Sequence, residues 1–410
     1  MDEPPWAVGL LLVRVKKVLE QHIAVFGESG SGKTVMLSSF YGATQEPQYR
    51  REGLVNIVAD DIGQGSHLHR NYLGMKDSAR LPAPTRFSST SYAFSVKLKN
   101  TGSTAANKAK QFDSMRLVWH DYPGEWFEQG VSGPEEARRR VDTFRSLLGS
   151  DVALLLVDGQ RLLDNAGEEE RYLKSLLANY RNGLLSLRED LLEDGKPLVK
   201  FPRIWMLALS KADLLPELDV FKFRDLLIDR VAEDLDELRH TLAGLVESNE
   251  ALAVGEDFLL LSSARFEVGK IEVTKRVGLD LILPLAAIVP FERHVRWIEQ
   301  KKAGAKVAEE LLDGAGALAA AVLGMAGGRV GKLGALVGRF DARIRTLMAV
   351  LGSEQVSTLV NSAAELAGNK LRERNAEALA RQDYMAALLT GYQMDLEKGE
   401  ADEVLLLSQR

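Results

Sequence analysis

The sequence predicts an α/β protein, in which a doubly wound domain at 20–289 precedes an all-α domain at 290–410. Nearly all-apolar runs of strand length recur through the first region, as expected of parallel strands that are covered on both faces. Stretches with apolar residues at helical spacing separate these runs and supply the covering helices. After Pro290 no strand pattern is convincing, proline is absent, and Ala, Leu, Glu, Lys and Arg recur at helical spacing.

The composition is that of a globular protein without an overall attraction to nucleic acid. Of the 410 residues, 46% are hydrophobic and 27% are charged, which excludes a disordered, collagen-like or many-span membrane chain. The 52 Lys and Arg residues against 58 Asp and Glu give a net charge of −6, so we expect no nucleic-acid partner. The absence of cysteine fits a reducing cytoplasm, and the acidic start at residues 1–3 has the wrong sign for a signal peptide. We therefore expect a cytoplasmic protein.

The first α/β unit follows a lead-in segment at 1–19, whose apolar body and basic end fit either a strand or a helix. A short apolar run at 22–26 predicts a strand, the glycine cluster after it predicts a tight loop, and helical spacing resumes at Val35. An insertion at about 51–84 carries a predicted strand at 54–59 and a predicted helix at 64–75.

The rest of the sheet continues this alternation. Further strands are predicted at 92–99, 115–120, 151–158, 204–209 and 258–261. A helix starts with Ser132 as its N-cap and Pro134 in its first turn, and it stops at Gly149. Helical patterns at 166–193 and 217–250 complete the covering layers.

A phosphate-binding loop is predicted between the first strand and the first helix. Residues 27–34 match the pattern G-x-x-x-x-G-K-[ST] in the strand-to-helix context that this motif requires. Its glycines let successive N–H groups turn toward an anion at a helix N-terminus. Lys33 can then reach the β- and γ-phosphates, and the Thr34 hydroxyl can ligate Mg²⁺. The residues predicted to hold the phosphates are Gly27, Ser29, Gly30, Ser31, Gly32, Lys33, Thr34 and Val35.

A second phosphate-sensing segment follows the predicted strand at 115–120. Asp121 to Gly124 form a D-x-x-G pattern, in which Asp121 can act on the metal through a water molecule. The N–H of Gly124 can bond a γ-phosphate oxygen and is released when that phosphate leaves. The segment can therefore act as a switch.

Two further patterns select the base. The sequence S-K-A-D at 210–213 follows one predicted strand, and S-A-R at 263–265 follows another. The Asp213 carboxylate can accept from N1–H and the exocyclic amine of guanine, a donor pair that adenine lacks, while the Lys211 stem packs over the base. The backbone turn at 263–265 can offer an N–H to guanine O6. The residues predicted to contact guanine are Ser210, Lys211, Asp213, Ser263, Ala264 and Arg265.

With these four motifs, the sequence resembles the Ras-like, TRAFAC-type P-loop GTPases over roughly 20–289. The strings DYPGEW, SGKTV and SKAD look similar to the bacterial YcjX-like GTPases and related double-GTPase-type proteins, in which a helical region accompanies the GTPase core. The resemblance implies a doubly wound P-loop GTPase domain that binds GTP or GDP and hydrolyses GTP with Mg²⁺.

The resemblance also implies a switch I threonine that closes over the γ-phosphate and Mg²⁺ shortly before the strand at 92–99. Thr85 is our choice, and Ser88, Ser89 and Thr90 are alternatives. The metal ligands are then Thr34, Thr85 and Asp121, and the catalytic residues are Lys33, Thr85, Gly124 and Glu125.

The residue after the D-x-x-G glycine predicts slow hydrolysis. Ras-like enzymes usually place a glutamine there to orient the attacking water, whereas this chain has Glu125. A carboxylate can accept from that water but cannot donate to the γ-phosphate. Turnover should therefore be slow unless an arginine, in cis or from a partner, supplies charge. Arg86 is the candidate in cis, and the alternative is that Arg86 is a solvated loop residue.

Four other sequence features can be interpreted either as part of a functional site or as ordinary structure. Asp158 could be a Walker B carboxylate, but it has no second carboxylate beside it, so we interpret it as a strand-end residue near the site. Trp126 and Phe127 are either core residues or contacts for a partner. Arginines at 138–140 are interpreted as surface i,i+4 pairs.

The uncharged segment 314–328 is shorter than the about 20 residues of a bilayer span and suits close helix packing, with membrane contact as the alternative.

Three function classes remain open at this point. The first is a GTP-hydrolysing switch. An effector or regulator protein, or a second copy of the chain, would bind its switch region or its helical domain. The second is a mechanical or membrane-associated GTPase of dynamin-like logic. The third is a module that holds guanine nucleotide without turnover.

Overall fold

The computed structural model describes an eight-stranded sheet with helices on both faces. The described residues are 19–83, 90–99, 114–121, 123–127, 133–192, 195–196, 204–246, 254–301 and 384–408. Outside them lie residues 1–18 of the lead-in segment, Thr85, Arg86, Ser88, Ser89, Ser132 and the segment 314–328.

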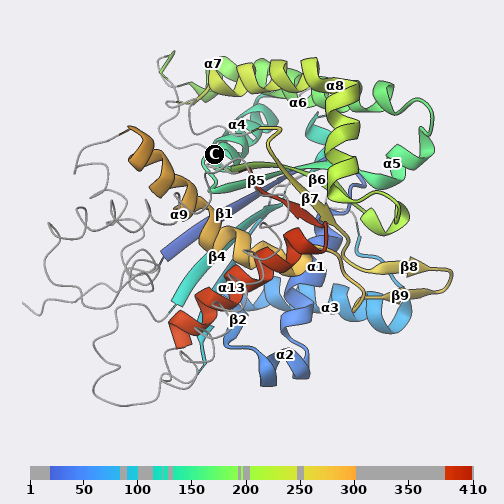
Figure 1. Ribbon diagram of the computed structural model, residues 1–410, viewed down its shortest axis with the longest axis vertical. Coiled ribbons are helices and arrows are strands. Elements are labelled where there is room, and N and C mark those ends of the chain that lie inside the picture. The colour runs from blue at the N-terminus through green and yellow to red at the C-terminus, as the bar shows by residue number, and fades with distance from the viewer. Residues whose placement is uncertain are drawn as a thin grey trace, which may run out of the picture.

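The strands follow the order β10-β7-β6-β5-β1-β4-β3-β2 (Figure 1). Their bounds are β1 (Leu19–Phe26), β2 (Val55–Ala59), β3 (Thr90–Leu98), β4 (Ser114–Asp121), β5 (Val152–Asp158), β6 (Ile204–Ser210), β7 (Asp257–Leu261) and β10 (Leu405–Leu406). The five strands from β7 to β4 run parallel, whereas β2, β3 and β10 pair antiparallel with their neighbours. The parallel centre brings the carboxyl ends of β1, β4, β5, β6 and β7 to one side, where such sheets bind ligands.

Helices cover the centre of the sheet in two layers (Figure 1). One layer holds α1 (Lys33–Thr44), α3 (Ile62–Ser78), α9 (Ile282–Lys301) and α13 (Tyr384–Ala401), and the other holds α4 (Pro134–Leu148), α6 (Glu169–Ser186) and α8 (Val220–Ala243). The short elements are α2 (Pro47–Glu52), α5 (Gly159–Asp164), α7 (Arg188–Leu191) and the hairpin of β8 (Arg265–Glu267) and β9 (Lys270–Glu272). Single 3-10 turns span Gly124–Phe127, Ala212–Leu214 and Leu279–Leu281. Within the described residues, no helix has the length and apolar character needed to cross a membrane.

Side-chain alternation along the central strands builds two separate cores. On β1, Ile23 and Val25 pack in the core with α1, while Ala24 and Phe26 pack in the core with α6 and α8. Strands β5 and β6 are buried along their whole length, which explains why nearly every position in them is apolar. The doubly wound α/β prediction is confirmed.

The described C-terminal residues differ from the sequence prediction in two ways. The border predicted at 290 falls inside α9, because residues 282–289 are all buried against the sheet and the helix continues through Pro290. Beyond it, where no strand is predicted, Leu405 pairs with Leu259 and forms β10 at the edge of the sheet. Helices α9 and α13 pack in the same core as α1, so these two parts of the predicted 290–410 domain are not separate from the sheet. For residues 302–383, which lie outside the described part of the chain, the all-α domain remains a prediction.

A buried ion pair fixes this attachment of the C-terminal residues. Arg293 of α9 donates to Asp257 Oδ1 at the start of β7. The N–H of Ser408 donates to the same carboxylate oxygen at 2.7 Å, and the Ser408 carbonyl oxygen accepts from Arg293 at 3.1 Å. The strand β7 is therefore held by both α9 and the segment after β10.

Candidate nucleotide-binding site

The phosphate loop links β1 to α1, as the motif predicts. Gly30 and Gly32 have φ angles of 82° and 91°, a left-handed backbone that favours glycine. Gly32 is the N-cap of α1, so the loop lies at the positive end of the helix dipole. Lys33 Nζ donates to the carbonyl oxygens of Gly27 at 2.7 Å and Glu28 at 2.9 Å. The lysine ammonium is thus held by the backbone carbonyl oxygens of the loop.

Strand β4 brings a carboxylate to the first turn of α1. The Thr34 hydroxyl donates to Asp121 Oδ2 at 3.2 Å, and Asp121 is buried. Hydroxyl and carboxylate oxygens are the hard ligands that Mg²⁺ prefers, so this pair has the chemistry of a magnesium site. Of the switch I candidates, Thr90 is described: it begins β3 directly opposite Asp121 in the strand ladder.

Gly124 lies directly against the phosphate loop. A Cβ built on it would be 2.3 Å from the backbone nitrogen of Ser29 and 2.4 Å from the carbonyl carbon of Glu28. Neither backbone atom can retreat unless the loop moves, so only glycine fits this position. The D-x-x-G segment and the phosphate loop are therefore in backbone contact.

The 3-10 turn after Gly124 is held by α4. Trp126 is buried there, beside Arg140, whose guanidinium carbon is 5.7 Å from the Trp126 ring centroid. Arg140 also donates to the Trp126 carbonyl oxygen at 3.0 Å and pairs with Glu136 one helical turn earlier. The i,i+4 pair predicted within 138–140 is therefore present at Arg140, but its surface location is wrong, because the turn packs over Arg140 and leaves it 5% exposed. Glu125 is half-buried in the same turn.

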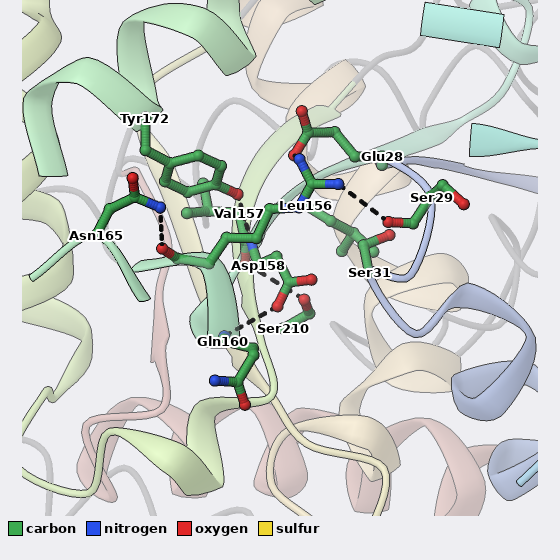
Figure 2. A network of polar contacts seen from close by, with 12 residues as sticks. Glu28, Ser29, Ser31, Leu156, Val157, Asp158, Gln160, Asn165, Tyr172 and Ser210 are labelled. Carbon is green, nitrogen blue, oxygen red and sulfur yellow. Dashed lines mark hydrogen bonds and ion pairs between the residues drawn. The ribbon is translucent and has the colours of Figure 1, made fainter. Parts of the chain in front are cut away.

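The carboxyl ends of β5 and β6 meet in a second cluster (Figure 2). Asp158 ends β5 and caps α5, since its Oδ1 accepts from the N–H of Gln160 at 2.9 Å. Its Oδ2 accepts from Lys211 Nζ at 2.8 Å. A Cβ on Gly159 would be 2.7 Å from the Ser210 carbonyl oxygen, so the two strand ends pack closely. Asp158 is a strand-end residue, as predicted.

Ser262 links Asp213 to the turn after β7. The Ser262 hydroxyl donates to Asp213 Oδ1 at 2.7 Å and lies 2.7 Å from the Ala264 carbonyl oxygen. Two of the segments predicted to contact the base are therefore joined. The sequence pattern predicts a base contact from residues 263–265, whereas the hydrogen bond to Asp213 comes from Ser262, one residue earlier. The two adjacent serines at the end of β7 are the sequence feature that could have indicated Ser262.

Arg265 and Val35 lie at the margins of the predicted site. Arg265 begins β8 and pairs with Glu267 at 3.3 Å, with more than half of its side chain exposed. Val35, in the first turn of α1, packs against the cluster that contains Ala264. Val35 and the turn after β7 therefore belong to one hydrophobic cluster.

Sequence reasoning missed two residues at the phosphate loop, Glu28 and Arg161. Glu28 is 4% exposed, and its Oε2 is 3.0 Å from Arg161 Nη1. Arg161 Nη2 also donates to the Ser29 carbonyl oxygen at 3.4 Å. The motif leaves the residue at position 28 unspecified, and Arg161 follows a different strand, so no local pattern links them.

His120, next to Asp121, belongs to a polar link across the sheet. Its ring stacks on that of His22 with centroids 5.3 Å apart, and His22 Nδ1 is 3.1 Å from His120 Nε2. On its other side, His120 Nδ1 is 2.9 Å from Ser91 Oγ. Burial and the neighbouring His22 lower the pKa of His120 to about 4. This ring therefore carries no charge near neutral pH.

These contacts define a P-loop nucleotide-binding fold. The phosphate loop follows β1, and the groups that flank it come from the carboxyl ends of β4, β5, β6 and β7. No protein-family model matches the sequence, and no curated protein matches it.

Among the solved structures that the chain resembles are three with low TM-scores. The Methanosarcina barkeri Roco2 RocCORdC bound to GDP has a TM-score of 0.24 and 12% identity, over 72% of this chain and 50% of that one. The S. cerevisiae Ski7 GTPase-like domain bound to GTP has a TM-score of 0.25 and 16% identity, over 60% of this chain and 43% of that one. The same domain bound to GDP and inorganic phosphate has a TM-score of 0.25 and 15% identity, over 60% of this chain and 44% of that one. The chain spans half or less of these structures, and at such TM-scores the function must be argued from its own residues.

Proposed function

We propose that the chain is a guanine-nucleotide-binding protein that hydrolyses GTP to GDP with Mg²⁺. The observation that carries the proposal is the backbone contact of Gly124 with the phosphate loop, beside the hydrogen bond from Thr34 to Asp121. A segment so placed can respond to whether a γ-phosphate is bound in the loop. That response is what a nucleotide switch requires.

The phosphate side of the site divides its tasks among few groups. Lys33 leaves the loop carbonyls to bind the β- and γ-phosphates, and the N–H of Gly124 binds a γ-phosphate oxygen. Thr34 and Asp121 would hold Mg²⁺, which supplies charge neutralisation at the phosphates, and Thr85 would close over both. Loss of the γ-phosphate then releases Gly124 and Thr85 together.

The base side of the site selects guanine. Asp213 accepts from the two donors on the guanine edge, and Lys211 packs along the base. The turn at 263–265 offers an N–H to guanine O6. Support for this assignment comes from the hydrogen bond between Ser262 and Asp213, which holds the carboxylate beside that turn.

Titration calorimetry with GDP, a GTP analogue and an ATP analogue, with and without Mg²⁺, tests the proposal. We expect guanine to be preferred by about 10⁴-fold or more, because adenine would leave the Asp213 carboxylate unpaired. Asp213→Asn should reduce this preference, since an amide can also donate. Equal affinities of the wild-type protein for GDP and ADP would refute the assignment.

Glu125 favours one alternative, a module that holds guanine nucleotide without turnover. This carboxylate occupies the position from which a glutamine usually orients water, and its charge would lie near the phosphate oxygens. A single-turnover assay separates the two functions: phosphate release identifies a hydrolase, and bound GTP that persists identifies a binding module.

A further inference from the structure

Glu28 places a carboxylate inside a loop that is built to bind anions. Its side chain is almost fully buried, and its carbonyl oxygen accepts from Lys33 Nζ. A buried carboxylate beside a polyphosphate is unfavourable for two reasons, because it loses hydration and because it repels the phosphate charges. A loop with this residue therefore needs a cation that offsets the carboxylate.

Arg161 supplies such a cation. Its Nη1 is 3.0 Å from Glu28 Oε2, and its Nη2 donates to the Ser29 carbonyl oxygen at 3.4 Å. The backbone nitrogen of Ser29 is the atom that a Cβ on Gly124 would meet first. The guanidinium thus reaches the loop where the D-x-x-G segment packs against it.

Helix α5 holds Arg161 in this position. Asp158 caps the helix at its start, where it accepts from the Gln160 N–H (Figure 2). At the end of the helix, the side-chain amide of Asn165 donates to the Arg161 carbonyl oxygen at 2.8 Å. Gly159 packs against the carbonyl oxygens of Ser210 and Lys211. The residue that pairs with the phosphate loop is therefore anchored to the base side of the site.

We propose that Arg161 is a positioning residue that neutralises Glu28 and so allows the phosphate loop to accept a nucleoside di- or triphosphate. The inference rests on the proposed function and adds a residue to it. Arg161 acts through Glu28, so the effect of removing Arg161 depends on the carboxylate being present. The effect grows with the charge of the ligand, because repulsion increases with each phosphate charge.

A double-mutant cycle tests this dependence. The variants are Arg161→Ala, Glu28→Gln and the two combined, each titrated with GDP and with a non-hydrolysable GTP analogue in Mg²⁺. Arg224→Ala is the matched control, because Arg224 forms its ion pair with Asp225, its neighbour on α8. Thermal midpoints without nucleotide report whether each variant is folded.

We expect Arg161→Ala to weaken GTP-analogue binding by about tenfold or more, and GDP binding by less, because the buried Glu28 carboxylate then loses the guanidinium that offsets its charge. Glu28→Gln and the double variant should bind within about threefold of wild type. The control should match wild type. If Arg161→Ala does not fold, Arg161→Gln replaces it in both backgrounds.

Two results would overturn the inference while leaving guanine-nucleotide binding intact. One is wild-type affinity in Arg161→Ala, which would mean that the pair has no role in binding. The other is a double variant as weak as Arg161→Ala, which would mean that Arg161 contacts the phosphates directly. Failure of the wild-type protein to bind either guanine nucleotide would instead refute the proposed function.

Discussion

One methyl group on Gly124 would meet the backbone of Glu28 and Ser29. We expect Gly124→Ala to displace the D-x-x-G segment and to weaken GTP-analogue binding by about tenfold, with a smaller loss for GDP, because the Gly124 N–H is proposed to bond only the γ-phosphate. Calorimetry with both nucleotides measures the difference. Gly133→Ala is the control, since a Cβ there has no neighbour within 4 Å. Equal losses for both nucleotides would contradict the role given to Gly124.

His120 should make the stability of the protein depend on pH. Its pKa is about 4 in the folded protein and 6.5 in an unfolded chain, so the unfolded state binds the proton first as pH falls. The folded protein should therefore lose up to about 3 kcal/mol between pH 6.5 and pH 4. The groups that face the ring are His22, Ser91 and, beyond His22, Glu20.

Urea unfolding at a series of pH values tests this expectation. His120→Gln removes the titrating ring and should flatten the stability profile over this range. His240→Gln, an exposed position on α8, is the control and should keep the wild-type slope. An unchanged slope in His120→Gln would assign the pH dependence to other groups.

Contacts between the motif segments could be expected from the sequence, because each motif has a fixed spacing and follows a predicted strand, while the roles of its residues stay predictions. The patterns predict that Thr34 and Asp121 belong to one metal site, and the Thr34 hydroxyl oxygen is 3.2 Å from Asp121 Oδ2. Ser262 and Arg161 could not be assigned in this way. No motif specifies either position, and each contact depends on how the strands are ordered rather than on local periodicity.

Among the elements, the long strands were predictable and the short edge strand was not. Strands β5 and β6 are buried on both faces, so their sequences are nearly continuous apolar runs. Strand β10 has only two residues, Leu405 and Leu406, and two residues have no period. The sequence break at Pro290 was also misleading, because α9 continues through that proline.

Strand β10 should contribute measurably to stability. Leu405 is fully buried, so Leu405→Ala should lower the free energy of unfolding by about 2–4 kcal/mol. Leu185→Ala on α6 is the control, because that side chain is 45% exposed. Denaturant unfolding compares the two variants. A loss at Leu405 no larger than that of the control would mean that this strand does not pair in solution.

For the molecule as an enzyme, the expected outcome is slow turnover. Without glutamine at position 125, we expect single-turnover hydrolysis near the ~10⁻⁴ s⁻¹ scale of unassisted small GTPases. Glu125→Gln should raise the rate, and Arg86→Ala should lower it if that arginine supplies charge. Glu125→Ala shows whether the carboxylate takes part at all. Fast wild-type turnover that none of these changes affects would place the water-positioning group elsewhere.

The pairing of β10 with β7 has a consequence for how the protein is made. A ribosome produces β7 well before it produces residues 405–406, so the outer edge of β7 stays open while the intervening chain is synthesised. An open strand edge can pair with other chains, and closing a long loop is entropically costly and slow. The nascent protein is therefore open to misassembly at this edge until residues 405–406 emerge and pair with β7.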